Sequence, residues 1–176
     1  MNLKSPLYFF ITISPIIFYS CTIGNARAKL QHDTINVLKA DSITSPESPC
    51  DLNLWKYVYD AQRLQVLDRC KIVTGIIEET SVNEDGDQHM LLKLDKGQKE
   101  LLTKKNKIKK QGNMVIEAVC INNITKKRAL GACTGYINQV QLPKIGDHVK
   151  VTGSYVIDSH NGWAEIHPIT KIELLK

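Results

Sequence analysis

Two histidines and two glutamates in the second half of the chain are the residues best suited to chemistry: His89, Glu117, Glu165 and His167. Imidazole and carboxylate groups bind divalent transition metals, and a carboxylate beside a histidine can perform acid–base catalysis. If their strands are neighbours, these side chains share one face and could form the site of a metal-dependent hydrolase. The alternative is a metal-free network in which Glu117 and His167 bond each other and Glu165 meets a lysine. We favour the network.

A second set of residues is suited to ligand binding. Trp163 stands at the mouth of an expected hairpin, where its ring can stack on a base or a sugar, and His160 lies in the adjoining turn. A lysine cluster further upstream can attract a polyanion in a salt-dependent way. The same lysines are equally explained as a solvated loop that keeps the protein soluble. The candidate ligand-binding residues are Trp163, His160, Lys104, Lys105, Lys107, Lys109 and Lys110.

Motifs for nucleophilic catalysis and phosphate binding are missing from the sequence. It contains no Gly-x-Ser-x-Gly elbow, no phosphate-binding glycine loop and no His-Glu-x-x-His pair. Asp85-Gly86-Asp87 lacks the further ligands of a calcium loop and is interpreted as a turn. Our first hypothesis is therefore a non-catalytic binding module without a cofactor, whose ligand is an oligonucleotide, a saccharide or a protein segment. The second is the hydrolase, with a divalent metal as its cofactor.

Four cysteines follow the first 49 residues: Cys50, Cys70, Cys120 and Cys133. An even number of cysteines in an exported chain indicates disulfides. We favour the pairs Cys50–Cys70 and Cys120–Cys133, each of which closes a short loop. The spacing includes no Cys-x-x-Cys pair, so a four-cysteine zinc site fits the sequence poorly.

The start of the chain has the features of a secretion signal. Lys4 gives a basic start, residues 7–23 carry no charge, and Ala26-Arg27-Ala28 fits the rule for signal peptidase. We expect residues 1–28 to be cleaved and the protein to be secreted or held in the cell envelope. Loss of Lys4 and Arg27 lowers the formal net charge from +5 to +3. Only an uncleaved signal would anchor the chain in a membrane.

The remainder divides into a linker and one domain. Residues 29–49 contain Ser, Thr, Asp and Pro with few apolar residues, which is typical of a flexible linker. Residues 50–176 are enough for a domain with its own core. Between residues 51 and 67, apolar residues recur at spacings of three to five, which predicts a short helix or two turns packed on a sheet.

Alternating apolar residues predict five strands in this domain. Residues 146–168 contain the last two, joined through Asn161-Gly162, and Pro168 marks an edge or a bulge. The first three strands are expected at residues 69–80, 89–94 and 114–121. Gly75 indicates a bulge or bend in the first. Residues 96–112 form a basic insertion, and residues 122–140 a long irregular loop.

Five such strands, the glycine bend and the closing segment at residues 146–153 resemble the OB-fold, a five-stranded Greek-key barrel. We therefore predict an all-β, OB-like barrel with a short helical segment at its N-terminus. In the OB-fold the third and fifth strands are neighbours, which would bring Glu117 towards Glu165 or His167. The chain also resembles a group of secreted microbial proteins of unknown function, a resemblance that implies no activity and no site. It rests on Cys50, Trp55 to Tyr59, Arg63-Leu64, Cys70, Val73 to Gly75, Asp85 to Asp87, His89, Glu117, Cys120 and Gly162 to Pro168.

Overall fold

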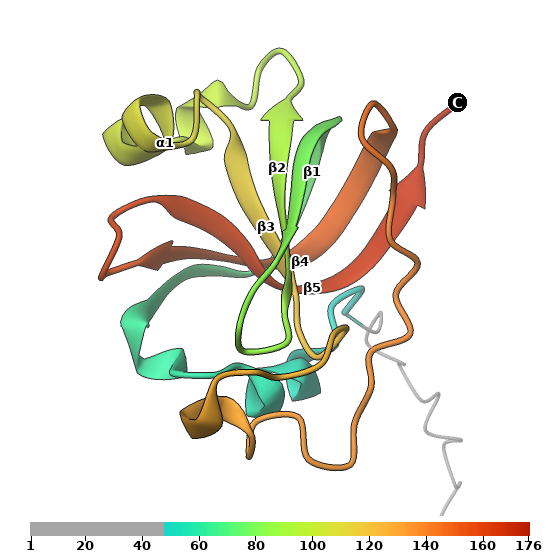
Figure 1. The fold of residues 1–176 in the computed structure, drawn as a ribbon. Helices are drawn as coiled ribbons and strands as arrows, with labels where there is room; N and C mark the ends of the chain where they lie inside the picture. Colours follow the sequence, from blue (N-terminus) through green and yellow to red (C-terminus); the bar gives the residue numbers. More distant parts are fainter. Residues whose placement is uncertain (1–47) are drawn as a thin grey trace, which may run out of the picture. The chain divides into compact units, whose positions relative to one another are not determined.

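The computed structural model describes residues 48–176 (Figure 1). The predicted signal, residues 1–28, and nearly all of the predicted linker, residues 29–49, lie outside the described residues. In the part that is described, no helix has the length and hydrophobicity needed to cross a membrane.

Five strands form the sheet of the described domain, as the alternating pattern predicts. β3 and β5 run parallel, and all other neighbouring strands run antiparallel. The strand order is β1-β2-β3-β5-β4, and the sheet closes into a ring because β4 also pairs with β1. The mostly β prediction is therefore confirmed. The strands are β1 Leu64–Val82, β2 Gln88–Leu94, β3 Met114–Ala118, β4 His148–Asp158 and β5 Ala164–Leu174.

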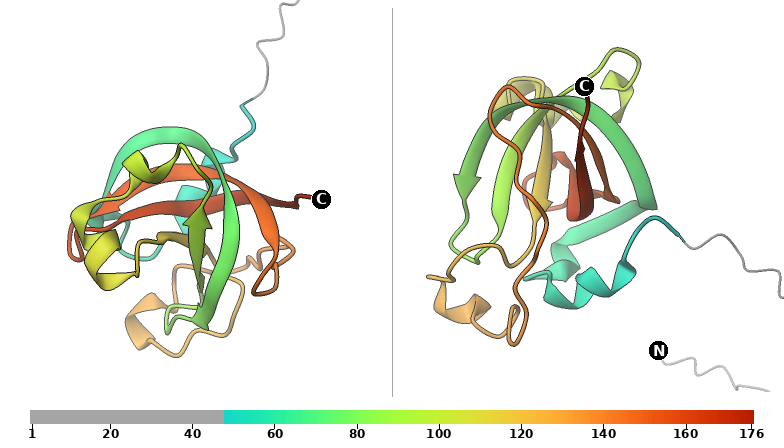
Figure 2. Two further views of the ribbon diagram at one scale, coloured as in Figure 1. Left: turned by 90° about the horizontal axis from the view of Figure 1, so that it is seen from above. Right: turned by 90° about the vertical axis from the view of Figure 1, so that its right-hand side faces the viewer.

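The first strand, β1, is long because it pairs with two neighbouring strands. Its beginning pairs with β4 and its end with β2, and Figure 2 shows it curving over the other strands. Gly75 pairs on both sides, with Leu94 and with Val149. A Cβ atom on Gly75 would lie 2.2 Å from the carbonyl oxygen of Lys93, so the close approach of β2 requires glycine. The register shifts of β1 lie elsewhere, at residues 66–71 and 77–79.

Three strand boundaries differ from those predicted. β1 begins at Leu64 rather than at residue 69, and β5 continues beyond Pro168 to Leu174. β3 ends at Ala118 rather than at residue 121, since Cys120 has a φ of 57° that takes the chain out of the sheet. The bulge expected near Pro168 is confirmed by register shifts in this part of the β4–β5 pair.

The basic insertion at residues 96–112 is more ordered than the sequence suggested. It forms the 3-10 turn η3, Lys99–Leu101, and the helix α1, Lys104–Lys109. Thr103 and Asn106 make a capping box that starts α1. Asn106 is fully buried and its amide donates to the carbonyls of Asn113 and Ala164, both at 3.0 Å. This one side chain fixes the helix to β5.

Apolar residues form two clusters. The main core includes Met90, Met114, Ile116 and Ile166, all fully buried. Directly after β3, Val119 packs in a second cluster with Val58 of the N-terminal segment and Leu64 at the start of β1. The predicted helical segment contains the 3-10 turns η1, Leu52–Tyr57, and η2, Ala61–Arg63. Figure 1 shows these turns beside the loop after β3, at one end of the sheet.

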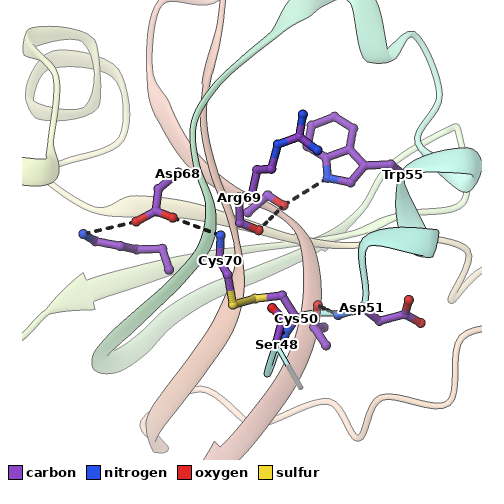
Figure 3. Close-up of a disulfide and its surroundings, with 10 residues drawn as sticks. Ser48, Cys50, Asp51, Trp55, Asp68, Arg69 and Cys70 are labelled. Carbon is purple, nitrogen blue, oxygen red and sulfur yellow. Dashed lines mark hydrogen bonds and ion pairs between the residues drawn. A yellow bond between two sulfur atoms is a disulfide. The ribbon is translucent and has the colours of Figure 1, made fainter. Parts of the chain in front are cut away.

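Both predicted disulfides are confirmed. Cys50–Cys70 ties η1 to β1, and Cys120–Cys133 ties the long loop after β3 to the end of that strand. Figure 3 shows the first bond beside Trp55 and Arg69. The indole of Trp55 donates to Ser154 Oγ at 3.0 Å, which adds a second tie between η1 and the sheet. Two disulfides are consistent with an oxidising, extracytoplasmic compartment.

The close approach at Gly75 gives a prediction. Gly75→Ala should lower the free energy of unfolding by about 1 to 3 kcal/mol, because the added methyl group meets the backbone of β2. Urea unfolding followed by circular dichroism measures this. Gly131→Ala is the matched control, since no atom lies within 4 Å of the position that its Cβ would take. Equal stability of the two variants would contradict the close packing at Gly75.

Candidate binding cleft

A polar cleft of about 340 Å³ lies on the face of the sheet opposite the main core. Strands β1, β2, β3 and β5 contribute to it through Ser81, His89, Glu117 and Glu165. The β1–β2 turn adds Asn83, and the β4–β5 turn adds Asn161 and Trp163. Three of the four predicted metal-ligand candidates therefore line one cleft together with the predicted aromatic residue. The fourth, His167, lies directly behind them.

Cross-strand pairing explains why these residues meet. Ser81 is paired with His89, and His89 with Glu117, so their side chains follow one row across three strands. Between β3 and β5, Val115 pairs with Glu165. The parallel register places His167 opposite Glu117 two positions further along. The prediction that the third and fifth strands are neighbours in the sheet is thus confirmed.

His167 is fully buried among three carboxylates. Its Nδ1 lies 3.0 Å from Glu117 Oε2 and 3.3 Å from Glu165 Oε2, and its Nε2 lies 3.7 Å from Asp87 Oδ2. The predicted bond between Glu117 and His167 is present as an ion pair. Glu165 meets Trp163, whose indole N–H donates to it, and His167, rather than the lysine that the sequence suggested.

The carboxylates keep His167 positively charged. Burial alone would lower the pKa of His167, but the charges of Glu117 and Glu165 raise it to about 10. Burial likewise opposes ionisation of Glu117, yet His167 lowers the pKa of this carboxyl to about 2. Burial raises the pKa of Asp87 to about 7 and also raises that of Glu165, with a contribution from the charge of Glu117. The imidazolium is therefore the central cation of the cluster.

Asp87, Glu117 and His167 are also the described residues best placed to hold a metal ion. Their ligand atoms lie within 4.8 Å of one another, and Asp87 Oδ2 and His167 Nε2 have no hydrogen-bond partner among the described residues. However, the two carboxylates lie beside different nitrogens of one ring. A metal on Nε2 would have Asp87 as its near second ligand, whereas a metal on Nδ1 would have both Glu117 and Glu165. A proton on each nitrogen satisfies the same geometry, because each N–H then points to a carboxylate.

Arg63 is a site residue that the sequence analysis did not identify. Its Nε donates to Asp158 Oδ2 at 3.2 Å, its Nη1 donates to the carbonyl of Tyr59 at 3.1 Å, and its Nη2 lies 3.9 Å from Glu117 Oε2. Burial would lower the pKa of Arg63, but Glu117, Glu165 and Asp158 raise it. Arg63 closes one side of the cleft from η2, a segment whose pattern indicated only packing.

Asp87 was also missed, because its sequence context indicated a turn. The turn is present, but the Asp87 side chain is buried and its Oδ1 accepts the N–H of Cys120 at 3.0 Å. This bond links the β1–β2 turn to the disulfide at the end of β3. Its position in the sequence could have indicated a site residue, because Asp87 stands directly before a buried strand and two residues before His89.

Trp163 and Lys110 meet at the mouth of the cleft. Lys110 Nζ lies 4.1 Å from the centre of a Trp163 ring and 3.3 Å from His89 Nε2. A lysine ammonium can only donate, so His89 Nε2 accepts and the ring is neutral. The pKa of His89 is lowered mainly by burial and further by the charge of Lys110, which agrees with a neutral ring. Its proton then sits on Nδ1, 3.5 Å from Ser81 Oγ, so His89 cannot act as a base towards Ser81.

The remaining predicted binding residues do not line the cleft. Lys104, Lys105, Lys107 and Lys109 are exposed on α1, and His160 is exposed in the β4–β5 turn. Lys105 packs against Gly162, where a Cβ atom would lie 3.1 Å from Lys105 Cγ. The lysine helix thus borders the cleft beside Trp163, and only Lys110 enters it.

No protein-family model matches this chain, and no curated protein is detectably similar to it in sequence.

The charged histidine predicts a pH dependence of stability. Because the pKa of His167 is raised, its ion pairs contribute fully to the free energy of unfolding below pH 6.5, the ordinary pKa of histidine. This contribution is lost as the pH rises towards 10. Because the pKa of Glu117 is lowered, its carboxylate contributes to the free energy of unfolding above pH 4.5, the ordinary pKa of this group. That contribution is lost as the pH falls towards 2. Urea unfolding of the wild type at several pH values should therefore show a falling free energy of unfolding between pH 6.5 and 10.

His167→Gln should cost about 1 to 3 kcal/mol at pH 6 and should show a smaller decline above pH 6.5. His160→Gln, which changes an exposed histidine of the β4–β5 turn, is the control and should behave as the wild type. If His167→Gln keeps both the stability and the full pH dependence of the wild type, the buried histidine is not charged.

Proposed function

We propose that this chain is an exported OB-like binding module that holds a polar ligand in the cleft and performs no catalysis. The proposal depends on one observation: the cleft lies between the β1–β2 turn and the β4–β5 turn, on the outer faces of β2 and β3. In OB-folds, these two loops and this pair of strands bind oligonucleotides and oligosaccharides. The strand order, with β3 parallel to β5, supports the Greek-key assignment.

The chemical state of the site residues supports binding rather than catalysis. Glu117 is held by His167, Asp158 by Arg63, and His89 Nε2 by Lys110. No hydroxyl group in the cleft has a hydrogen-bonded base that is free to take its proton. At the mouth, the Trp163 ring, the Ser81 hydroxyl and the side-chain oxygen of Asn161 can stack on or hydrogen-bond to a ligand, whereas the Asn161 amide nitrogen donates to Asp158 Oδ2 at 2.8 Å.

Among the three ligand classes, a saccharide fits the cleft best. Four carboxylates, on Glu79, Glu117, Asp158 and Glu165, line it against two cations, Arg63 and Lys110, and this excess of carboxylates disfavours the phosphates of an oligonucleotide. Carboxylates and amides bind sugar hydroxyls, and the Trp163 ring offers a stacking surface. The exposed lysines of α1 would attract a polyanion to the rim, outside the cleft.

Fluorescence of Trp163 tests the proposal. The chain contains two tryptophans, so Trp55→Phe leaves Trp163 as the only indole. Titration of this variant with short saccharide oligomers and with single-stranded DNA should give a saturable change for saccharides. Trp163→Ala should weaken binding, measured by calorimetry, by about 1 to 3 kcal/mol, the contribution of aromatic stacking. Trp163→Phe, which keeps Trp55, should give no fluorescence change. A cleft that responds to no probe would refute the binding function.

A metal-dependent hydrolase is the second candidate, favoured by the grouping of Asp87, Glu117 and His167 and by the unpartnered atoms of Asp87 and His167. Thermal melting with zinc or manganese separates the two functions. A bound metal would raise the melting temperature of the wild type by mass action, and Asp87→Asn would abolish that rise. Asp85→Asn, in the same turn, is the control. Under the binding function we expect no metal-dependent rise in any of the three proteins.

A further inference from the structure

The cleft and the residues directly behind it are short of positive charge. Three cations, Arg63, Lys110 and His167, face a larger number of carboxylates, and His89 is neutral. Burial, together with the charge of Glu117, raises the pKa values of Asp87 and Glu165, which reduces the negative charge of this set. An additional cation in the cleft would favour the ionised form of these two carboxyl groups. The five carboxylates are Glu79, Asp87, Glu117, Asp158 and Glu165.

The position of Lys110 indicates where the cleft can hold a positively charged group. Its ammonium group lies over the Trp163 ring and contacts His89, and it forms no ion pair with any described residue. Gln111 and Gly112, which follow it, both have positive φ, so the turn after α1 directs Lys110 towards the cleft. A cation over an indole ring is attracted by its π electrons. Lys110 thus occupies the position that a ligand ammonium would prefer.

We propose that the cleft binds a saccharide unit that carries a free amino group. Its ammonium group competes with that of Lys110 for the face of Trp163 and is attracted by Glu79, the exposed carboxylate of the cleft. Its hydroxyl groups meet Ser81 and Asn161 at the mouth. This inference rests on the proposed binding function and names the chemical class of its ligand.

A matched pair of probes tests the amino group. The Trp55→Phe variant is titrated with a glucosamine tetramer and with the N-acetylglucosamine tetramer of equal length, which lacks the charge. We expect the charged tetramer to bind at least roughly tenfold more tightly, the ratio that corresponds to about 1.4 kcal/mol. Calorimetry on the unsubstituted chain repeats the comparison without relying on the Trp55 substitution.

Two variants test the position of the ammonium group. Lys110→Met should tighten binding of the charged tetramer because it removes the internal competitor. Glu79→Gln should weaken binding roughly two- to fivefold, as expected for a solvent-exposed charge pair. Glu100→Gln removes an exposed carboxylate outside the cleft and should leave the affinity unchanged.

The possible outcomes are distinguishable. Equal affinity for the two tetramers would overturn the inference and leave the binding function intact. Weaker binding in Lys110→Met would also overturn it, because Lys110 would then contact the ligand instead of competing with it. If neither tetramer binds but single-stranded DNA does, the saccharide class is wrong; if no probe binds, the proposed function fails as well.

Discussion

Burial of a charged histidine is the interaction on which this domain depends. An ion inside a protein is tolerated only when opposite charges and hydrogen bonds surround it. The partners of His167 come from three segments: Asp87 from the β1–β2 turn, Glu117 from β3 and Glu165 from β5 itself. The parallel contact between β3 and β5 is short, with two pairs of residues in register. The ion cluster therefore supplies much of the specificity that this contact cannot obtain from backbone pairing alone.

The same cluster determines what the cleft can do. Its carboxylates and its histidine are engaged with one another, so the floor of the cleft is rigid and chemically occupied. Arg63 reaches this floor from the N-terminal segment, which the Cys50–Cys70 bond ties to β1. The solvent-exposed residues of the cleft are Glu79 and Ser81 near the end of β1 and Asn161 in the β4–β5 turn. This division between a fixed floor and an adaptable rim suits recognition better than turnover.

Much of the fold could be predicted from the sequence, because alternation, turn residues and cysteine number are local signals. The strands, both disulfides and the meeting of Glu117 with His167 follow from such signals and from the expected strand order. Arg63 and Asp87 could not be predicted, since each acts through contacts with residues distant in the sequence. The helix α1 was missed because its stability comes from Asn106, a buried amide whose partners lie on other elements. The position of Lys110 over Trp163 has the same long-range origin.

The ring of strands has a consequence for how this domain meets other molecules. An open sheet exposes two rows of unpaired peptide groups, and these rows recruit strands from other molecules. Here β1 pairs with both of its neighbours at Gly75 and Ile76 and leaves no such edge between them, and the missing side chain at Gly75 lets β2 approach closely. The topology of the backbone itself thus protects this part of the domain against strand-by-strand association.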